Sequence, residues 1–229
     1  MKNVIAIDGP AGAGKSTLSK LLARKLDFIY LDTGAMYRAI TFLALENGID
    51  INDNEKLGEL AKNTNFEFKQ CVKSNTNKII VNGIDITNNL RKIRIDKNVS
   101  IVAKAKKVRS AMLIKQREIA KNGNIIMDGR DIGSRVLPDA DIKFFVTASL
   151  DERSKRRYLE MKKNNKDISL EKIKEKISKR DKMDIEREIS PLCKTSDAIL
   201  IDTTNLSIKE ALKKMIKIVK GEKDVKTII

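Results

Sequence analysis

The residues best suited to chemistry stand near the N-terminus, where positions 9–16 read GPAGAGKS. Glycines in this spacing let a backbone wrap closely around phosphate and point N–H groups inward. Lys15 can place a mobile positive charge on the β- and γ-phosphates of a nucleoside triphosphate, and the Ser16 hydroxyl can bind Mg²⁺. The predicted triphosphate contacts are Gly9, Pro10, Ala11, Gly12, Ala13, Gly14, Lys15, Ser16 and Thr17.

A second set of charged residues follows other apolar runs of the sequence. Asp128 ends such a run, and next to a phosphate-binding loop such an aspartate commonly serves Mg²⁺, so Ser16 and Asp128 are the predicted metal ligands. Arg130 and Asp131 follow it directly. Arginines provide fixed forks that suit phosphate, and phosphoryl transfer mainly needs its charge positioned and neutralised. The chain has no histidine, so the commonest general base is excluded.

Arg180, Asp184 and Arg187 lie four and three residues apart, which predicts that they share one helix face. Taken alone, the Arg180–Asp184 pair is better explained as a solvent-exposed ion pair of little energetic weight. Its occurrence together with the phosphate-binding loop favours a functional interpretation.

Alternating strands and helices are expected to position these residues. Five short apolar runs predict buried parallel strands at 3–8, 28–31, 124–128, 142–147 and 198–202. Helical spacing predicts helices at 16–26, 36–45, 102–121, 150–163, 170–188 and 207–219. This order implies an α/β fold with a parallel sheet covered on both faces, in which ligands bind at the carboxyl ends of the strands.

Two segments depart from this alternation. Residues 52–100 are polar and rich in asparagine, with strand-like pieces at 66–69 and 78–81 and a turn at Asn82-Gly83, so they predict a small β-containing insertion. Residues 153–167 are dense in arginine and lysine and are a second candidate lobe.

Composition narrows the class of protein further. The net charge of +16 favours anionic partners such as nucleic acid, a membrane surface or phosphorylated small molecules, although lysine-rich solvated helices are the better explanation for most of it. Cys71 and Cys193 fit no metal or redox spacing and are expected to be ordinary thiols. No apolar run approaches 18 residues and no signal-peptide pattern is visible, so a cytoplasmic protein without a membrane partner is expected.

Taken together, these motifs resemble those of bacterial cytidylate kinases, a family of P-loop nucleoside monophosphate kinases. The resemblance covers nearly the whole chain and rests above all on DGRDIG and RDxxDxxR, supported by LDTGAMYRA, VRSAMLIKQR and ERSKRR. It implies a P-loop NTPase-type five-stranded parallel sheet flanked by helices, with a nucleoside monophosphate (NMP)-binding insertion and a helical lid. The implied boundaries are 1–35, 109–152 and 169–229 for the core, 36–108 for the NMP-binding lobe and 153–168 for the lid.

The resemblance also implies residue roles, carried over position by position. Thr33, Arg38 and Arg130 match residues that grip the acceptor, and Ser100, Arg109 and Asp131 match the residues that read cytosine. Arg180 and Asp184 match a sugar-binding pair, Arg187 an arginine near the transferred phosphate, and Arg153 and Arg157 the lid on the ATP side. The implied catalytic set is Lys15, Arg130, Arg187, Arg157 and Asp128. Thr33 replaces a serine of many relatives, and Met183 stands where some have arginine.

The sequence therefore predicts Mg²⁺-dependent transfer of phosphate from ATP to CMP or dCMP, by a monomer that does not bind nucleic acid. A kinase for UMP, AMP or another metabolite is an alternative within the class. A nucleic-acid-stimulated ATPase is another, but the basic residues lack interleaved aromatics. A nucleotide-binding regulator without activity is disfavoured by the intact Lys15, Ser16 and Asp128.

Overall fold

The computed structural model describes residues 3–71, 76–163 and 168–221. By its internal contacts the chain divides into two compact units. The first unit runs to Tyr30 and resumes at Gly123, and the second unit is Leu31–Asn122. The side chain of Cys71 and residues 164–167 of the predicted lid lie outside the part of the chain that the structure describes.

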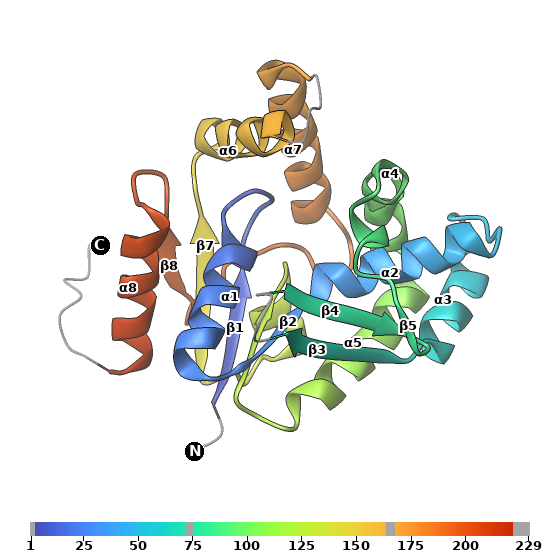
Figure 1. Ribbon diagram of the computed structural model, residues 1–229, viewed down its shortest axis with the longest axis horizontal. Helices are drawn as coiled ribbons and strands as arrows, with labels where there is room; N and C mark the ends of the chain where they lie inside the picture. Colours follow the sequence, from blue (N-terminus) through green and yellow to red (C-terminus); the bar gives the residue numbers. More distant parts are fainter. Residues whose placement is uncertain (1–2, 72–75, 164–167, 222–229) are drawn as a thin grey trace. The chain divides into compact units, whose positions relative to one another are not determined.

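The chain forms a five-stranded parallel sheet, as predicted (Figure 1). Its strand order is β2-β6-β1-β7-β8, so β1 pairs with β6 on one side and with β7 on the other. In this register Ile7 pairs with Asp128, and Asp8 pairs with Phe145. Asp8 and Asp128 therefore both lie at the carboxyl ends of their parallel strands. The strands are β1 (Val4–Asp8), β2 (Ile29–Asp32), β6 (Ile125–Asp128), β7 (Ile142–Thr147) and β8 (Ile199–Asp202).

The α-helices of the first unit are α1 (Lys15–Leu26), α6 (Leu150–Lys163), α7 (Leu170–Ile185) and α8 (Ile208–Val219). α1 and α8 pack together against the strands, where Leu22, Phe144 and Met215 are almost fully buried in one hydrophobic cluster. Burial of this apolar surface is the main stabilising contribution that the cluster makes. α6 and α7 pack against each other. Arg153 and Arg157 lie on α6, and Arg180 and Asp184 lie on α7.

The second unit combines helices with a small antiparallel sheet in the order β3-β4-β5. Its core cluster includes Ala39 of α2, with Ile79, Val81, Ile86 and Leu90. The elements are α2 (Thr33–Glu46), α3 (Asn54–Asn63), β3 (Phe66–Cys71), β4 (Thr76–Val81), β5 (Ile84–Asp85), a short 3₁₀ turn (Asn89–Arg91), α4 (Ile93–Val102) and α5 (Lys106–Ala120).

Several predicted elements need correction. The insertion at 52–100 has the predicted sheet and turn, with Asn82 and Gly83 both at positive φ, but it also contains the helices α3 and α4, which sequence reasoning missed. The helix predicted at 102–121 starts at Lys106, because Val102 still belongs to α4 and the chain turns between them. The helix predicted at 170–188 ends at Ile185, so Arg187 follows α7 and is not on its face.

Candidate active site

The phosphate-binding loop joins β1 to α1 and depends on glycine at defined points. A Cβ on Gly9, which has φ +145°, would lie 1.9 Å from the backbone oxygen of Val146. Gly14 adopts the left-handed conformation and leads into α1 without a capping side chain. The N–H groups of the first helical turn therefore point toward the loop with the positive end of the helix dipole, which is a ready anion site.

Lys15 is buried within this loop. Its Nζ donates a 2.7 Å hydrogen bond to the backbone oxygen of Pro10, and the residue is only 6% exposed. Burial lowers the pKa of Lys15 well below that of a free lysine, and the positive charge of Arg130 lowers it further, against opposing effects of Asp128 and Asp8. A buried ammonium among other cations is relieved by an anion, so the loop is electrostatically suited to phosphate.

Ser16 and Asp128 meet at the start of α1. The Ser16 hydroxyl donates a 2.8 Å hydrogen bond to Oδ2 of Asp128, and the Tyr30 hydroxyl donates one of 2.7 Å to Oδ1. Asp128 is 3% exposed. Hard oxygen donors of this kind fit Mg²⁺, which usually keeps several waters and takes one or two protein ligands. Among the described residues no group of three or more acidic, cysteine or histidine side chains could hold a metal.

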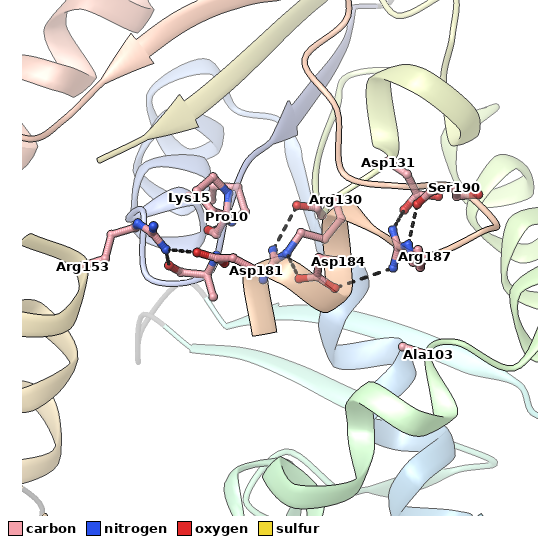
Figure 2. A network of polar contacts seen from close by, with 12 residues as sticks. Pro10, Lys15, Ala103, Arg130, Asp131, Arg153, Asp181, Asp184, Arg187 and Ser190 are labelled. Carbon is pink, nitrogen blue, oxygen red and sulfur yellow. Dashed lines mark hydrogen bonds and ion pairs between the residues drawn. The ribbon is translucent and has the colours of Figure 1, made fainter. Parts of the chain in front are cut away.

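Arginines and aspartates alternate in a network beyond the loop (Figure 2). Arg130 Nε donates a 2.8 Å hydrogen bond to Asp184 on α7. Arg187 lies 3.9 Å from the other oxygen of Asp184 and 3.5 Å from Asp131, and its Nε donates to the backbone oxygen of Ser190. Burial raises the pKa of Asp184, but the charge and hydrogen bond of Arg130, with Arg180 and Arg187, outweigh it, so the net pKa is lowered.

The structure thus brings Arg130, Asp131, Asp184 and Arg187 together, as the sequence suggested for most of them. Arg187 reaches Asp184 although it lies beyond the helix end. The positive charge of Arg180 lowers the pKa of both Lys15 and Asp184, so Arg180 belongs to the same electrostatic network.

The two predicted lid arginines differ in environment. Arg157 is 39% exposed in its side chain and pairs with Glu160 on the same helix. Arg153 is buried and bonds to the backbone oxygens of Ala148 and Ala11 and to Asp181.

Sequence reasoning missed two buried aspartates. Asp8 accepts hydrogen bonds from the backbone N–H groups of Ile132, at 2.8 Å, and Gly133, at 2.7 Å. These residues begin a π-helical turn (Ile132–Val136), so Asp8 fixes the segment that carries Asp131. Its pKa is raised to about 6 by burial, against the two hydrogen bonds. Asp181 was the other; its position directly after Arg180 in the RDxxDxxR motif was the available signal for it.

The remaining predicted residues lie in the second unit, and they are Thr33, Arg38, Ser100 and Arg109. Thr33 begins α2 and is 3% exposed. Arg38 on α2 bonds to Asp96 of α4 and to the backbone oxygen of Leu90. Arg109 on α5 is 7% exposed, donates to the backbone oxygen of Ala103 and lies 5.6 Å from the ring centre of Tyr37. Ser100 is half-buried on α4.

A glycine loop between a parallel strand and a helix, with a buried lysine and a cluster of arginines at the strand ends, defines a P-loop kinase of small molecules. The cytidylate kinase family model matches residues 5–221. Cytidylate kinases of Bacillus cereus (strain B4264) and Bacillus thuringiensis (strain Al Hakam) are each 51% identical over 217 residues, which cover 95% of this chain and 96% of theirs. The chain belongs to the cytidylate kinase family.

Solved structures agree at the level of fold. An uncharacterized protein from Eubacterium ventriosum ATCC 27560 superposes with a TM-score of 0.53 at 16% identity, covering 96% of this chain and 99% of that one. Within residues 3–71, 76–163 and 168–221, no helix has the length and apolar character to cross a membrane.

Proposed function

We propose that this protein transfers the γ-phosphoryl group of ATP to CMP and dCMP, giving ADP with CDP or dCDP. The observation that carries the proposal is membership of the cytidylate kinase family, whose model matches residues 5–221. The half-buried Arg130–Asp184 pair beside a P-loop supports it, because phosphoryl transfer needs fixed positive charge rather than a strong base.

On the donor side, loop 9–16 and Thr17 would hold the triphosphate, with Lys15 moving from the oxygen of Pro10 to the β- and γ-phosphates. Ser16 and Asp128 would hold Mg²⁺, which would supply positive charge to neutralise the phosphates. Of the lid residues, Arg157 has a side chain that is 39% exposed and would contact ATP, whereas Arg153 is buried against the loop.

On the acceptor side, we propose that Thr33, Arg38 and Arg130 hold the CMP phosphate. Arg180 and Asp184 would contact the sugar, and Ser100, Arg109 and Asp131 the base. Cytosine presents an amino group and a carbonyl, so a carboxylate acceptor and an arginine donor complement it. Arg187 would stabilise charge near the reacting groups. The acceptor phosphate is itself the nucleophile, so no histidine is needed.

Incubating the protein with ATP, Mg²⁺ and CMP, and separating the products by ion-exchange chromatography, tests the proposal. We expect equal amounts of ADP and CDP. ADP that forms without CDP, and faster in the presence of RNA, would instead indicate a nucleic-acid-stimulated ATPase. We further propose that the protein is a cytoplasmic monomer, which size-exclusion chromatography with light scattering checks for the oligomeric state.

A further inference from the structure

Both backbone polar groups of Ala11, in the middle of the phosphate-binding loop, bond to side chains of distant helices. The Ala11 N–H donates a 3.0 Å hydrogen bond to Oδ1 of Asp181 on α7. Arg153 on α6 donates from Nη1 to the Ala11 oxygen, also at 3.0 Å, and forms an ion pair with the other oxygen of Asp181. Asp181, Arg153 and Ala11 therefore form a closed ring of polar contacts.

This ring is buried, since the side chains of Arg153 and Asp181 are 9% and 12% exposed. Arg153 Nε also donates a 2.9 Å hydrogen bond to the oxygen of Ala148, just before α6. The arginine packs so closely that a Cβ on Gly12 would lie 3.3 Å from the Cβ of Arg153. Charge-assisted hydrogen bonds with little access to water are among the stronger polar contacts in proteins, so the ring restrains the loop.

Two roles for Arg153 can be distinguished by its charge. An arginine that contacts ATP must offer positive charge, but Asp181 neutralises this one in the structure. An arginine that shapes the loop needs Asp181, because the aspartate orients its guanidinium and binds the same residue of the loop. The three contacts to Ala11 and Ala148 fit the second role.

We infer that Asp181 and Arg153 are positioning residues that hold the phosphate-binding loop in its anion-binding conformation. They act through Ala11, not by touching the nucleotide. The inference rests on the proposed use of loop 9–16 to bind ATP. It also links the donor loop to α7, the helix that carries Arg180 and Asp184 of the proposed acceptor site.

The test is binding of ADP by calorimetry, with KM for ATP and for CMP, in Asp181→Ala, Asp181→Asn and Arg153→Lys. We expect Asp181→Ala to weaken ADP binding and raise KM for ATP by about 10-fold, because small misplacements of binding groups cost one to two orders of magnitude. KM for CMP should change less than about twofold. Asp181→Asn keeps an acceptor for the Ala11 N–H, so its effect should be smaller.

The matched control is Asp151→Asn, because Asp151 on α6 pairs with Lys174 on α7 at 2.5 Å and neither residue belongs to the ring of Ala11, Arg153 and Asp181. This variant should bind ADP like the unmodified protein. In a double-mutant cycle, Asp181→Ala with Arg153→Ala should weaken ADP binding by clearly less than the two single changes combined.

An ADP affinity that stays the same or increases in Asp181→Ala would overturn the inference, since freeing an ATP-contacting arginine would strengthen binding. Equal rises of KM for ATP and CMP would also overturn it, because they indicate general damage. If Asp181→Ala does not fold, Asp181→Asn and Arg153→Lys decide by the same readouts. A protein that binds ADP but makes no CDP would refute the proposed function and leave this inference standing.

Discussion

Arg130 and Asp184 form a hydrogen-bonded ion pair in which Nε of the arginine lies 2.8 Å from Oδ2 of the aspartate, with side chains 18% and 17% exposed. The pair joins the segment after β6 to α7 and places a neutralised arginine next to the phosphate-binding loop. Because Arg130 also lowers the pKa of Lys15, the donor loop and the arginine network are electrostatically linked.

Asp184→Asn should leave Arg130 and Arg187 without their shared carboxylate. We expect a loss of about 1–3 kcal/mol in the free energy of unfolding at pH 7, and at least a 10-fold lower kcat/KM for CMP. The folded pKa of Asp184 is lowered, so its stabilisation is present above the ordinary pKa of 3.8 and is lost as pH falls below it. Urea unfolding between pH 3 and 7 should show this acid loss in the unmodified protein.

The control for that prediction is Asp197→Asn, which removes the 2.6 Å ion pair with Lys143 elsewhere in the first unit. Its kcat/KM should stay within about twofold. Acid unfolding of Asp184→Asn that matches the unmodified protein would contradict the role given to this carboxylate.

Lys15→Met should separate activity from stability. We expect kcat to fall by at least about 100-fold, as for other groups that stabilise charge in a transition state. The fold should become more stable at pH 7. Burial lowers the pKa of Lys15, and this costs the native state free energy at every pH at which the unfolded chain keeps the lysine protonated. This gain should shrink as pH rises toward the ordinary pKa of 10.5. Thermal unfolding at pH 7 and 9.5 measures it, with Lys25→Met on the same helix as the control; lower stability at pH 7 would be the contrary result.

Asp8 should give a pH dependence of opposite sign to that of Asp184. Its folded pKa is raised from 3.8 to about 6, so the native state keeps this proton in a range where the unfolded chain loses it. Stability should therefore decrease as pH rises from about 4 to 6, by on the order of 3 kcal/mol from this group. Comparing Asp8→Asn with the unmodified protein by urea unfolding isolates the contribution, and parallel stability curves would speak against it.

Asp131→Ala should selectively damage the use of CMP if this carboxylate reads the cytosine amino group. We expect KM for CMP to rise at least 10-fold while the Kd for ADP stays within about twofold. Arg187 loses a partner 3.5 Å away, so a lower melting temperature is expected as well. Steady-state kinetics measures the KM for CMP, and calorimetry measures the Kd for ADP. Equal weakening of ATP and CMP binding would rule out a specific role.

Much of this arrangement could be predicted because its signals are local. Each strand of the large sheet is a short apolar run, and Gly9–Ser16 and Asp128 follow such runs directly in the sequence. α3 was harder to predict from the sequence. Asp53 caps its N-terminus, but the segment is polar and few of its residues are buried, chiefly Leu57 and Ala61.

Other features depend on contacts between distant residues. The ring of Ala11, Arg153 and Asp181 joins three segments, and sequence spacing indicates none of these contacts. The end of α7 at Ile185 could not be predicted either, because residues 186–188 are charged and compatible with a helix. Arg187 reaches its carboxylates from the following turn, where its Nε bonds to the oxygen of Ser190.

The most direct test of the central claim is kcat/KM for CMP, dCMP, UMP and AMP, from ADP release at fixed ATP and Mg²⁺. We expect CMP and dCMP to be the best acceptors and to exceed UMP and AMP by at least about 100-fold. Uracil has a carbonyl where cytosine has the amino donor, which leaves the polar groups of the site unpaired, and adenine is a larger purine. A preference for UMP or AMP would contradict the claim.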